Sequence, residues 1–494
     1  MVGRRRHGIP GTRAARRAGL GLLLVAAATL LLLPTARGVD VTRTMAGPDS
    51  TLPVDVYVPE SAGAAAAPGV VVAHGFAGSS TLMRTWSLAL AHAGFVVVTP
   101  DLPGHGANPT PLDEGGTVLA DAVMTAVGHL LGVPEADVDR IALLGHSMGS
   151  GAVLDAGAAR PDLIRSVVAV SPTDGTVDAT APRDLLLLAG ENEGRFVANA
   201  RSLLERAGGA GGTAGDGDAR ALQIVPFVEH VSILFARPAH DASVTWLAAA
   251  LDHVPTGTAP TGPLLGWVLL AAGLLALWQA VVAEAATPAG APTVRRAAWL
   301  ALPVGGVAAT ASLVIITRSV DVTGLTGLLV AGEVGLWFLM AGTIWLRFGV
   351  RPVRPEARDV GWAALTALLL VAVAASTTTA WSPGWLTGVR ATAAVVLTLL
   401  LLPFSVAAAA MLHGRRGRRT VGAWLVVSVA VVVTLGAAAV VVPGIGFLFL
   451  ILPLLPAVLG VTVVAGAGVD RPWATGAASA AFLGWLLALL FPIA

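Results

Sequence analysis

The segment Ile141–Gly149, which reads IALLGHSMG, constrains the fold more than any other part of the chain. An apolar run of strand length ends in the pattern Gly-x-Ser-x-Gly, and a run of small residues suited to a helix follows it up to Ala159. A serine at such a tight strand-to-helix turn has its hydroxyl exposed at the carboxyl edge of a sheet. The flanking glycines let neighbouring backbone approach without a Cβ clash. We therefore interpret Ser147 as a nucleophile.

The composition indicates that the chain contains more than a soluble domain. Of 494 residues, 55% are hydrophobic and 12% are charged, which is too apolar for one soluble globule and indicates membrane spans. The net charge of +1 gives no support for nucleic-acid binding. The chain has no cysteine, so disulfides, thiolate catalysis and cysteine metal sites are excluded.

The amino-terminal region has the pattern of a membrane-targeting segment. Residues 1–17 carry six arginines and are expected to form a cytoplasmic basic segment. Residues 18–34 are almost wholly apolar, which predicts an uncleaved signal anchor. A cleaved signal peptide is the alternative, because residues 34–38 could hold a cleavage site. In both cases the residues after 38 are delivered across the membrane.

Residues 39–254 alternate short apolar runs with helix-length segments, a pattern that predicts an α/β fold with a mostly parallel sheet covered on both faces. Runs near 39–45 and 53–58 are expected to start the sheet in antiparallel fashion. The later strands are expected at 70–73, 95–99, 141–144, 166–170, 185–188 and 221–225. Only about fourteen residues separate the strands ending at 170 and beginning at 185, which leaves no room for a helical cap over a substrate pocket.

Residues 263–494 are expected to form an all-α membrane domain of about eight transmembrane helices. The expected spans are 263–285, 297–317, 324–346, 360–380, 391–412, 420–441, 444–466 and 473–492. With the amino terminus inside, eleven loop arginines of this half lie on the cytoplasmic side and two, Arg318 and Arg390, lie outside. This positive-inside asymmetry places residues 39–254 outside the cytoplasm. Glu333 is expected near the middle of its span, where a carboxylate is costly and is a functional candidate, although a protonated glutamate bonded to a neighbouring helix is the alternative.

A serine nucleophile needs a base and an acid, and the chain offers candidates for both after Ser147. The base takes the serine proton, and the acid holds the tautomer of the base. His230 follows the last expected strand at a loop position and is the preferred base. His240 and His253 fall on or just after the closing helix, where an exposed histidine is expected.

The acid is less well defined by the sequence. It is expected just past the strand at 185–188, where Glu193 is the first choice and Glu191 is its neighbour. Asp174, after the preceding strand, is the other candidate. At least two of these three are expected to be ordinary solvated loop acids.

The tetrahedral intermediate of acyl transfer also needs N–H donors. The segment 70–78 predicts a strand that runs into a glycine-containing loop. We expect the backbone N–H groups of Phe76 and Met148 to form the oxyanion hole. His74 and the DLPGHG segment at 101–106 are expected to shape their loops rather than to act on a substrate.

The ordered motifs HGFAG, DLPGHG, GHSMG and VEHVSILF make residues 39–254 resemble the α/β-hydrolase superfamily, with dienelactone-hydrolase-like esterases and serine aminopeptidase-like or monoglyceride-lipase-like enzymes as the nearest relatives. The resemblance covers under half of the chain. It implies acyl transfer to water through an acyl-serine intermediate, with no metal and no organic cofactor. Glutamate at position 193, where many relatives keep aspartate, departs from the usual pattern.

Together these features predict a multi-pass cell-membrane serine hydrolase whose extracytoplasmic domain cleaves an ester, or less readily an amide. The expected partners are a small-molecule or lipidic ester substrate and the lipid bilayer. The membrane surface or the outer loops of the later spans would then wall the uncapped pocket. The alternative is a multispan transport or scaffold protein whose outer domain keeps the hydrolase fold without catalysis.

Overall fold

The chain folds into two compact units, seen in a computed structural model that describes residues 10–62, 66–113, 117–259, 263–378, 386 and 388–494. The sheet unit comprises residues 31–264, 378–385 and 492–494. The helical unit comprises residues 1–30, 265–377 and 386–491. Arg4, Arg5 and Arg6 of the expected basic segment lie outside the described residues.

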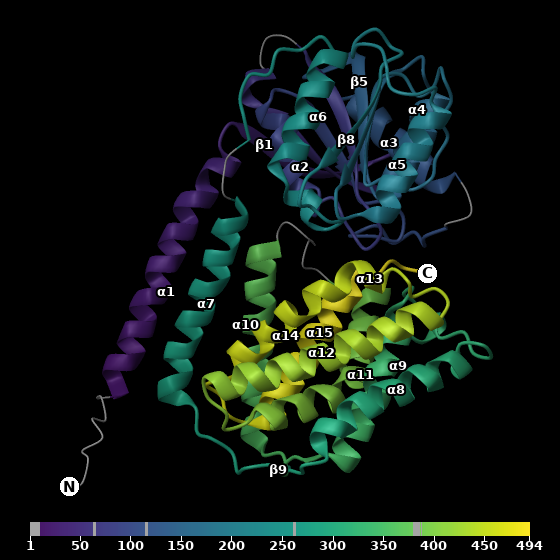
Figure 1. The fold of residues 1–494 in the computed structure, drawn as a ribbon. Coiled ribbons are helices and arrows are strands. Elements are labelled where there is room, and N and C mark those ends of the chain that lie inside the picture. The colour runs from purple at the N-terminus through teal and green to yellow at the C-terminus, as the bar shows by residue number, and fades with distance from the viewer. Residues whose placement is uncertain (1–9, 63–65, 114–116, 260–262, 379–385, 387) are drawn as a thin grey trace. The chain divides into compact units, whose positions relative to one another are not determined.

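The sheet unit contains one eight-stranded sheet in the order β1-β2-β4-β3-β5-β6-β7-β8 (Figure 1). β1 pairs with β2, and β2 with β4, in antiparallel fashion, whereas all the later pairs are parallel. The mostly parallel α/β fold expected from the sequence is therefore confirmed. The strands are β1 (Val39–Ala46), β2 (Leu52–Pro59), β3 (Ala67–Ala73), β4 (Val96–Pro100), β5 (Ala136–His146), β6 (Ile164–Val170), β7 (Leu185–Gly190) and β8 (Arg220–Val225).

Alternate strand residues bury against different helices. Leu143 and Val167 face a core completed by α3 (Val118–Leu130), α4 (Met148–Ala159) and α5 (Gly194–Arg206). Leu144 and Val168, their chain neighbours, face a second core completed by α2 (Arg84–His92) and α6 (Arg237–Ala250). This period of two is the geometry of a pleated strand buried on both faces, and it explains why the strands read as continuous apolar runs.

His240 is buried, contrary to the exposed position expected on the closing helix. Its side chain packs edge-on against Trp86, with ring centroids 4.5 Å apart, and its Nε2 lies 3.0 Å from the carbonyl oxygen of Leu234. α6 turns this histidine toward α2 because the apolar stripe of the helix includes Ala239 and Leu247. The pattern of apolar residues alone did not assign a histidine to that stripe.

Burial lowers the pKa of His240 to about 4, and this predicts an acid-sensitive sheet unit. Between pH 6.5 and 4 the unfolded chain binds a proton that the folded chain excludes, so the free energy of unfolding falls by about 3 kcal/mol as the pH drops through this window. Above pH 6.5 the effect is absent. The His240→Gln variant should show a shallower decline between pH 6.5 and 4, measured as urea midpoints of the full-length protein in detergent by pulse proteolysis. An unchanged slope would contradict the assignment.

The helical unit holds most of the membrane-span candidates. Eight helices among the described residues are long and apolar enough to cross a membrane. They correspond to α1 (Pro10–Leu32), α7 (Pro263–Ala285), α8 (Ala298–Ile316), α10 (Ala357–Thr378), α11 (Val389–Leu412), α12 (Arg418–Val441), the pair α13 (Leu448–Ile451) and α14 (Leu455–Gly466), and α15 (Pro472–Leu490). These eight helices are consistent with a multi-pass membrane protein.

The expected span at 324–346 differs from the structure. The helix there, α9 (Ala331–Phe348), begins seven residues later than expected, after a 3-10 turn at Thr323–Leu325, and it is not among the eight candidates. Glu333 therefore lies in the first turn of α9 and not near the middle of a span. A carboxylate is favoured there by the unpaired N–H groups of a helix start, while the Oε2 atom of Glu333 is buried without a hydrogen-bond partner among the described residues.

A two-stranded ribbon fixes α9 beside α8. β9 (Thr293–Val294) precedes α8, β10 (Val350–Arg351) follows α9, and the two pair in antiparallel fashion. The start of α8 and the end of α9 therefore lie at the same end of the helical unit. The 18 residues of α9 span about 27 Å, close to the roughly 30 Å thickness of a bilayer core.

Candidate active site

Ser147 occupies the sharp turn between β5 and α4. Its backbone has φ +52° and ψ −120°, a strained conformation for a residue with a side chain, and its N–H donates to the carbonyl oxygen of Val170 at 2.9 Å. A Cβ on Gly145 would collide with the carbonyl of Gly149, and one on Gly149 would lie 2.5 Å from the carbonyl oxygen of His74. Both glycines of the motif are thus required by close backbone approach.

His230 meets Ser147 from the loop that follows β8. Its Nε2 lies 3.0 Å from Ser147 Oγ, within hydrogen-bond reach for proton transfer. The ring is 6% exposed and stacks on Phe196 of α5, with ring centroids 4.1 Å apart and planes 18° from parallel. Phe196 therefore limits the rotation of the imidazole, a contact that no sequence motif indicated.

The structure brings Glu193 to the far side of the His230 ring. Its Oε1 lies 3.3 Å from His230 Nδ1, an ion-pair distance at which the donor direction is not that of a good hydrogen bond. The carboxylate also accepts the Ser171 hydroxyl at 2.8 Å and the Gly190 N–H at 3.2 Å. These donors hold a carboxylate that is 5% exposed in a fixed orientation.

The two rival acids have other partners. Asp174 is exposed and pairs with Arg206 at 2.5 Å on the surface. The N–H of Gly175, followed by the Arg206 guanidinium, holds the pKa of Asp174 below its usual range. Glu191 accepts the backbone N–H of Phe227 at 2.9 Å, which fixes the loop between β8 and His230. Of the three candidates, Glu193 is the one with an atom within 4 Å of the His230 ring nitrogens.

The two expected N–H donors, Phe76 and Met148, belong to segments next to Ser147. Met148 is the first residue of α4, so its N–H belongs to the unpaired start of a helix. Phe76 follows Gly75, and a Cβ built on Gly75 would lie 3.0 Å from Ser147 Cβ. The loop that carries Phe76 therefore runs directly beside the serine.

His74 braces that loop. Its Nε2 accepts the N–H of Leu102 at 3.0 Å, and its Nδ1 lies 2.8 Å from the carbonyl oxygen of Gly75. Burial lowers the pKa of His74, and a neutral ring is what an accepting Nε2 requires. His74 thus links the loop at Phe76 to the segment after β4.

Asp101 shapes the turn after β4. Its carboxylate accepts the N–H groups of Ser80 at 2.7 Å and of Ala107 at 2.9 Å, and it pairs with Arg43 of β1. The DLPGHG segment is therefore held to two other parts of the sheet unit.

His146, which the sequence did not assign, contacts His230. Its Nε2 lies 3.2 Å from the carbonyl oxygen of His230, and the two rings lie 4.8 Å apart. Burial, followed by the nearby His230, lowers the pKa of His146 well below its usual value. A neutral His146 adds no positive charge beside the His230 ring. The position of His146 within the Gly-x-Ser-x-Gly motif is the sequence signal that could have assigned it to the site.

Among the described residues, no cluster of three or more His, Asp or Glu side chains could hold a metal ion. The segment 171–184, between β6 and β7, forms no helix. The uncapped edge expected from the short connection is therefore present in the sheet unit.

Comparison with known proteins agrees with this fold. Residues 68–248 match the family model described as alpha/beta hydrolase fold. The epoxide hydrolase of Caballeronia sordidicola is 32% identical over 107 residues, which are 22% of this chain and 31% of that protein. An uncharacterized protein of Mycobacterium tuberculosis is 30% identical over 115 residues, 23% of this chain and 32% of that protein. The chain thus spans about a third of the length of the curated relatives it matches.

Solved structures with a similar fold include a dienelactone hydrolase from Anabaena variabilis, 20% identical, covering 44% of this chain and 100% of that chain at a TM-score of 0.33. Another is an S-formylglutathione hydrolase from Agrobacterium tumefaciens, 18% identical, covering 43% of this chain and 95% of that chain at a TM-score of 0.34. The sheet unit is an α/β-hydrolase fold, and it shares one chain with several span-capable helices.

Proposed function

We propose that the protein is a membrane-anchored serine hydrolase that cleaves a carboxylic ester through an acyl-serine intermediate. The observation that carries the proposal is the 3.0 Å separation of Ser147 Oγ and His230 Nε2. Glu193 on the other side of the ring completes a nucleophile, base and acid in the chain order of α/β hydrolases.

In the proposed reaction His230 Nε2 takes the Ser147 proton as Oγ bonds to the ester carbonyl carbon. The N–H groups of Phe76 and Met148 stabilise the oxyanion, and one such donor is worth roughly 3 kcal/mol of transition-state stabilisation. His230 then gives its proton to the leaving alcohol as the carbon–oxygen bond breaks. Water repeats the sequence on the acyl-serine, releasing the acid and restoring Ser147. Glu193 keeps Nδ1 protonated and stabilises the imidazolium.

The serine at the turn favours an ester over the substrate class named for the Caballeronia sordidicola relative. If Ser147 opened an epoxide, the product would be an alkyl ether of serine, with no carbonyl for water to attack. Such an ether would not turn over. An acyl-serine retains the carbonyl, so the same oxyanion hole serves both half-reactions.

Labelling by a fluorophosphonate probe tests the proposal. Full-length protein in detergent should be labelled at Ser147, located by peptide mapping, and a slowly hydrolysed ester should protect it. Ser243 is a matched buried serine whose hydroxyl donates within α6 to the carbonyl oxygen of Ala239 at 3.0 Å, and it should stay unlabelled. A folded protein that reacts at neither residue, or equally at both, would point to the non-catalytic alternative.

We propose a lipidic ester as the substrate because an exposed aromatic residue lies on the same loop as His230, three residues earlier in the chain. Phe227 is 91% exposed, has φ +60° and lies three residues before His230, with its N–H held by Glu191. Exposure of an aromatic ring to water and a strained backbone conformation both cost free energy. Contact between the ring and an acyl chain would offset part of this cost.

The Phe227→Ala variant should lower kcat/KM for a long-chain ester by about tenfold, because the ring then buries no acyl surface. Hydrolysis of an acetyl ester by the same variant should change by less than about twofold, since alanine leaves the backbone and Glu191 in place. Equal losses for both chain lengths would show that Phe227 has a structural role only.

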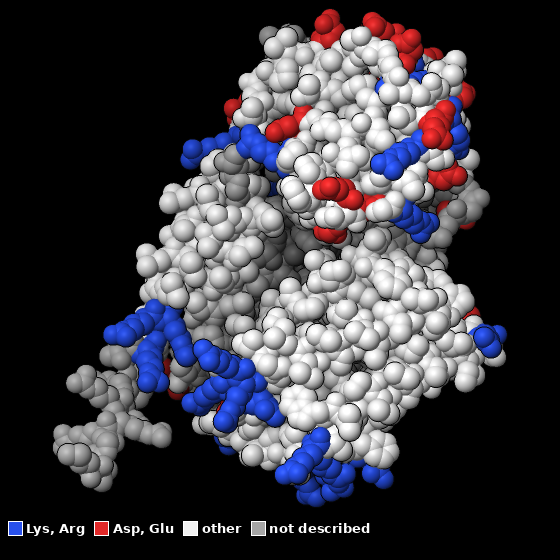
Figure 2. Space-filling view, viewed as in Figure 1, with Lys and Arg blue, Asp and Glu red and all other residues white. Residues whose placement is uncertain are grey.

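We further propose that the sheet unit lies outside the cytoplasm and that α1 is an uncleaved anchor. Gly21 of α1 and Gly273 of α7 meet so closely that a Cβ on Gly21 would lie 2.9 Å from the Gly273 carbonyl oxygen. Small residues at such a contact are typical of packed membrane helices. Since α9 lies antiparallel to α8, we count it as a span, and the arginine asymmetry then applies throughout the helical unit (Figure 2).

The mass of the mature protein tests the anchor. We expect residues 18–34 to be present in protein purified from membranes, because α1 contributes a packing surface to α7. A mature chain that begins near residue 38 would contradict it. A protease added outside intact cells should cut the exposed segment at 208–217 of the sheet unit.

A further inference from the structure

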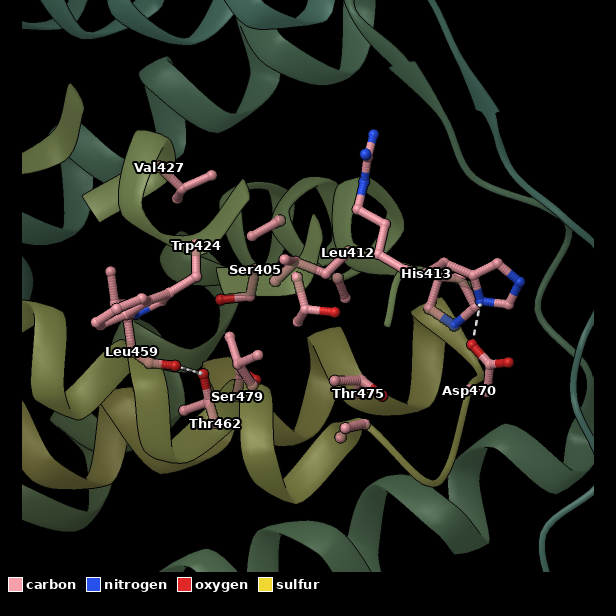
Figure 3. Close-up of a pocket in the computed structure, with 18 of the residues that line it drawn as sticks. Ser405, Leu412, His413, Trp424, Val427, Leu459, Thr462, Asp470, Thr475 and Ser479 are labelled. Atoms are coloured by element: carbon pink, nitrogen blue, oxygen red, sulfur yellow. Dashed lines mark hydrogen bonds and ion pairs between the residues drawn. The ribbon is translucent and has the colours of Figure 1, made fainter. Parts of the chain in front are cut away.

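The helical unit contains a cavity that the proposed hydrolysis does not use. It lies among α11, α12, α14 and α15, opens to the surface, and has a volume of about 80 Å³ for the centres of water-sized molecules. Apolar side chains form much of its wall, and Figure 3 shows several of them around one hollow. They include Phe404, Leu412, Trp424, Val427, Leu459 and Leu483.

The cavity wall also offers polar groups to an occupant. The Ser405 hydroxyl is 3% exposed and has no hydrogen-bond partner among the described residues. By contrast, the Thr462 hydroxyl is bonded to the carbonyl oxygen of Leu459 at 2.8 Å. An orphaned buried hydroxyl beside open space is a sign of an absent bound group.

One end of the cavity is basic. The residues His413, Gly414 and Arg415 line both the cavity and a shallow depression that also includes Arg416 and Arg419. An apolar hollow and a basic surface depression therefore share one wall.

The acidic residue at this end already has partners. Asp470 lies 3.1 Å from His413 Nδ1 and also accepts the N–H of Gly414 (Figure 3). Arg471, which also lines the cavity, is paired with Asp359 and Glu356. The charges of these residues are therefore largely compensated within the protein.

The other three arginines at this end, Arg415, Arg416 and Arg419, give it a net positive charge. Arg415 donates to the carbonyl oxygen of Met411 and lies over the Trp299 ring at 5.5 Å, which fixes its guanidinium at the mouth. Arg416 and Arg419 are exposed. Guanidinium groups bind phosphate oxygens in bidentate fashion, so this cluster is suited to a phosphate.

We propose that this site binds an anionic phospholipid, with its phosphate on Arg416 and Arg419 and one acyl chain in the cavity. The apolar wall matches the chain, the basic depression matches the headgroup, and His413–Arg415 lies between them. Basic pockets between membrane helices on the cytoplasmic side are typical lipid headgroup sites. The arginine distribution assigns this end of the helical unit to that side.

The test uses delipidated full-length protein in a nonionic detergent and native mass spectrometry. Phosphatidylglycerol should bind at one molecule per chain, and phosphatidylcholine with the same chains should bind at least tenfold more weakly. The Arg416→Gln/Arg419→Gln variant should bind phosphatidylglycerol about thirtyfold more weakly, from the usual contribution of two basic residues. The Arg347→Gln/Arg354→Gln variant removes two exposed arginines that line neither the cavity nor the depression and should bind as the wild type does.

Two further arms distinguish the lipid from its headgroup alone and from nonspecific charge. Ala408 lines the cavity, and Ala408→Leu should weaken binding of the long-chain lipid by filling the space for the chain. Inorganic phosphate at the same concentration should compete poorly. Strong competition by phosphate together with normal binding by Ala408→Leu would overturn the lipid proposal in favour of a free-phosphate site.

Equal loss of lipid in the two arginine variants would overturn the site itself. Fluorophosphonate labelling of Ser147 should be unchanged in all variants, so this proposal can fail without the hydrolase proposal failing.

Discussion

Alanine at His230 is expected to lower kcat/KM for ester hydrolysis by about 10⁴-fold or more, because Ser147 then has no base within reach. Ser147→Ala should lose a similar factor. The two residues act as one unit through the 3.0 Å contact of Oγ and Nε2. The double variant should therefore be no slower than the slower single variant, and the small remaining rate should come from the oxyanion donors.

The measurement is steady-state hydrolysis of a chromogenic ester by the full-length protein in detergent. His129→Ala is a control, because this histidine lies on α3 and not in the serine–histidine contact. It should keep full activity. Losses that multiply in the double variant would mean that Ser147 and His230 act in separate steps, and the proposed mechanism would then be wrong.

Glu193→Gln is expected to lower kcat by about 10³ to 10⁴-fold with little change in KM, because a neutral amide neither fixes the tautomer of His230 nor stabilises its imidazolium. Glu193→Asp keeps the charge but withdraws it by one methylene, so it should retain intermediate activity. The free energy of unfolding of Glu193→Gln should stay close to that of the wild type, since the Ser171 hydroxyl can still donate to the amide oxygen. The loss of kcat is then not a consequence of unfolding.

Matched variants at the two rival acids decide the assignment. Asp174→Asn removes a surface pair with Arg206, and Glu191→Gln keeps an oxygen that can accept the Phe227 N–H. Both should stay within about threefold of the wild-type kcat. A loss at Glu191→Gln as large as at Glu193→Gln would show that the neighbouring carboxylate contributes the charge.

The sequence predicted the sheet well because its signals are local. Strand-length apolar runs, tight glycine positions and the order of the motifs depend on residues close together along the chain. The turn at Ser147 is one example, since Gly145 and Gly149 specify it from within five residues. The location of His230 followed from the same rule, as a loop residue after the last strand.

The parts that failed depend on contacts between distant segments. The burial of His240 is determined by Trp86, 154 residues earlier in the chain, and the stacking of Phe196 on His230 has no sequence pattern. The sequence left three candidates for the acid because three carboxylates lie near the right strands. The 3.3 Å approach of Glu193 to His230 depends on residues distant in the chain, including Ser171, which donates to the carboxylate.

Arg390, which was expected in an outer loop and lies in the first turn of α11, shows the same limit. Its side chain is 2% exposed and donates to the carbonyl oxygens of Ala488 and Phe491, at the end of α15. A cation at a helix carboxyl end satisfies groups that the helix itself leaves unpaired. Arg390 therefore caps the carboxyl end of α15. This local contact explains why Arg390 does not follow the arginine asymmetry of the other loops.

The short ribbon of β9 and β10 has a consequence for how the protein is made. By joining the start of α8 to the end of α9, it holds the two helices together as a single antiparallel hairpin. During synthesis such a hairpin would enter the bilayer as one piece, and the more apolar α8 would carry its less apolar partner with it. The biogenesis of this region then depends on four ribbon residues, of which Val294 also lines the basic depression.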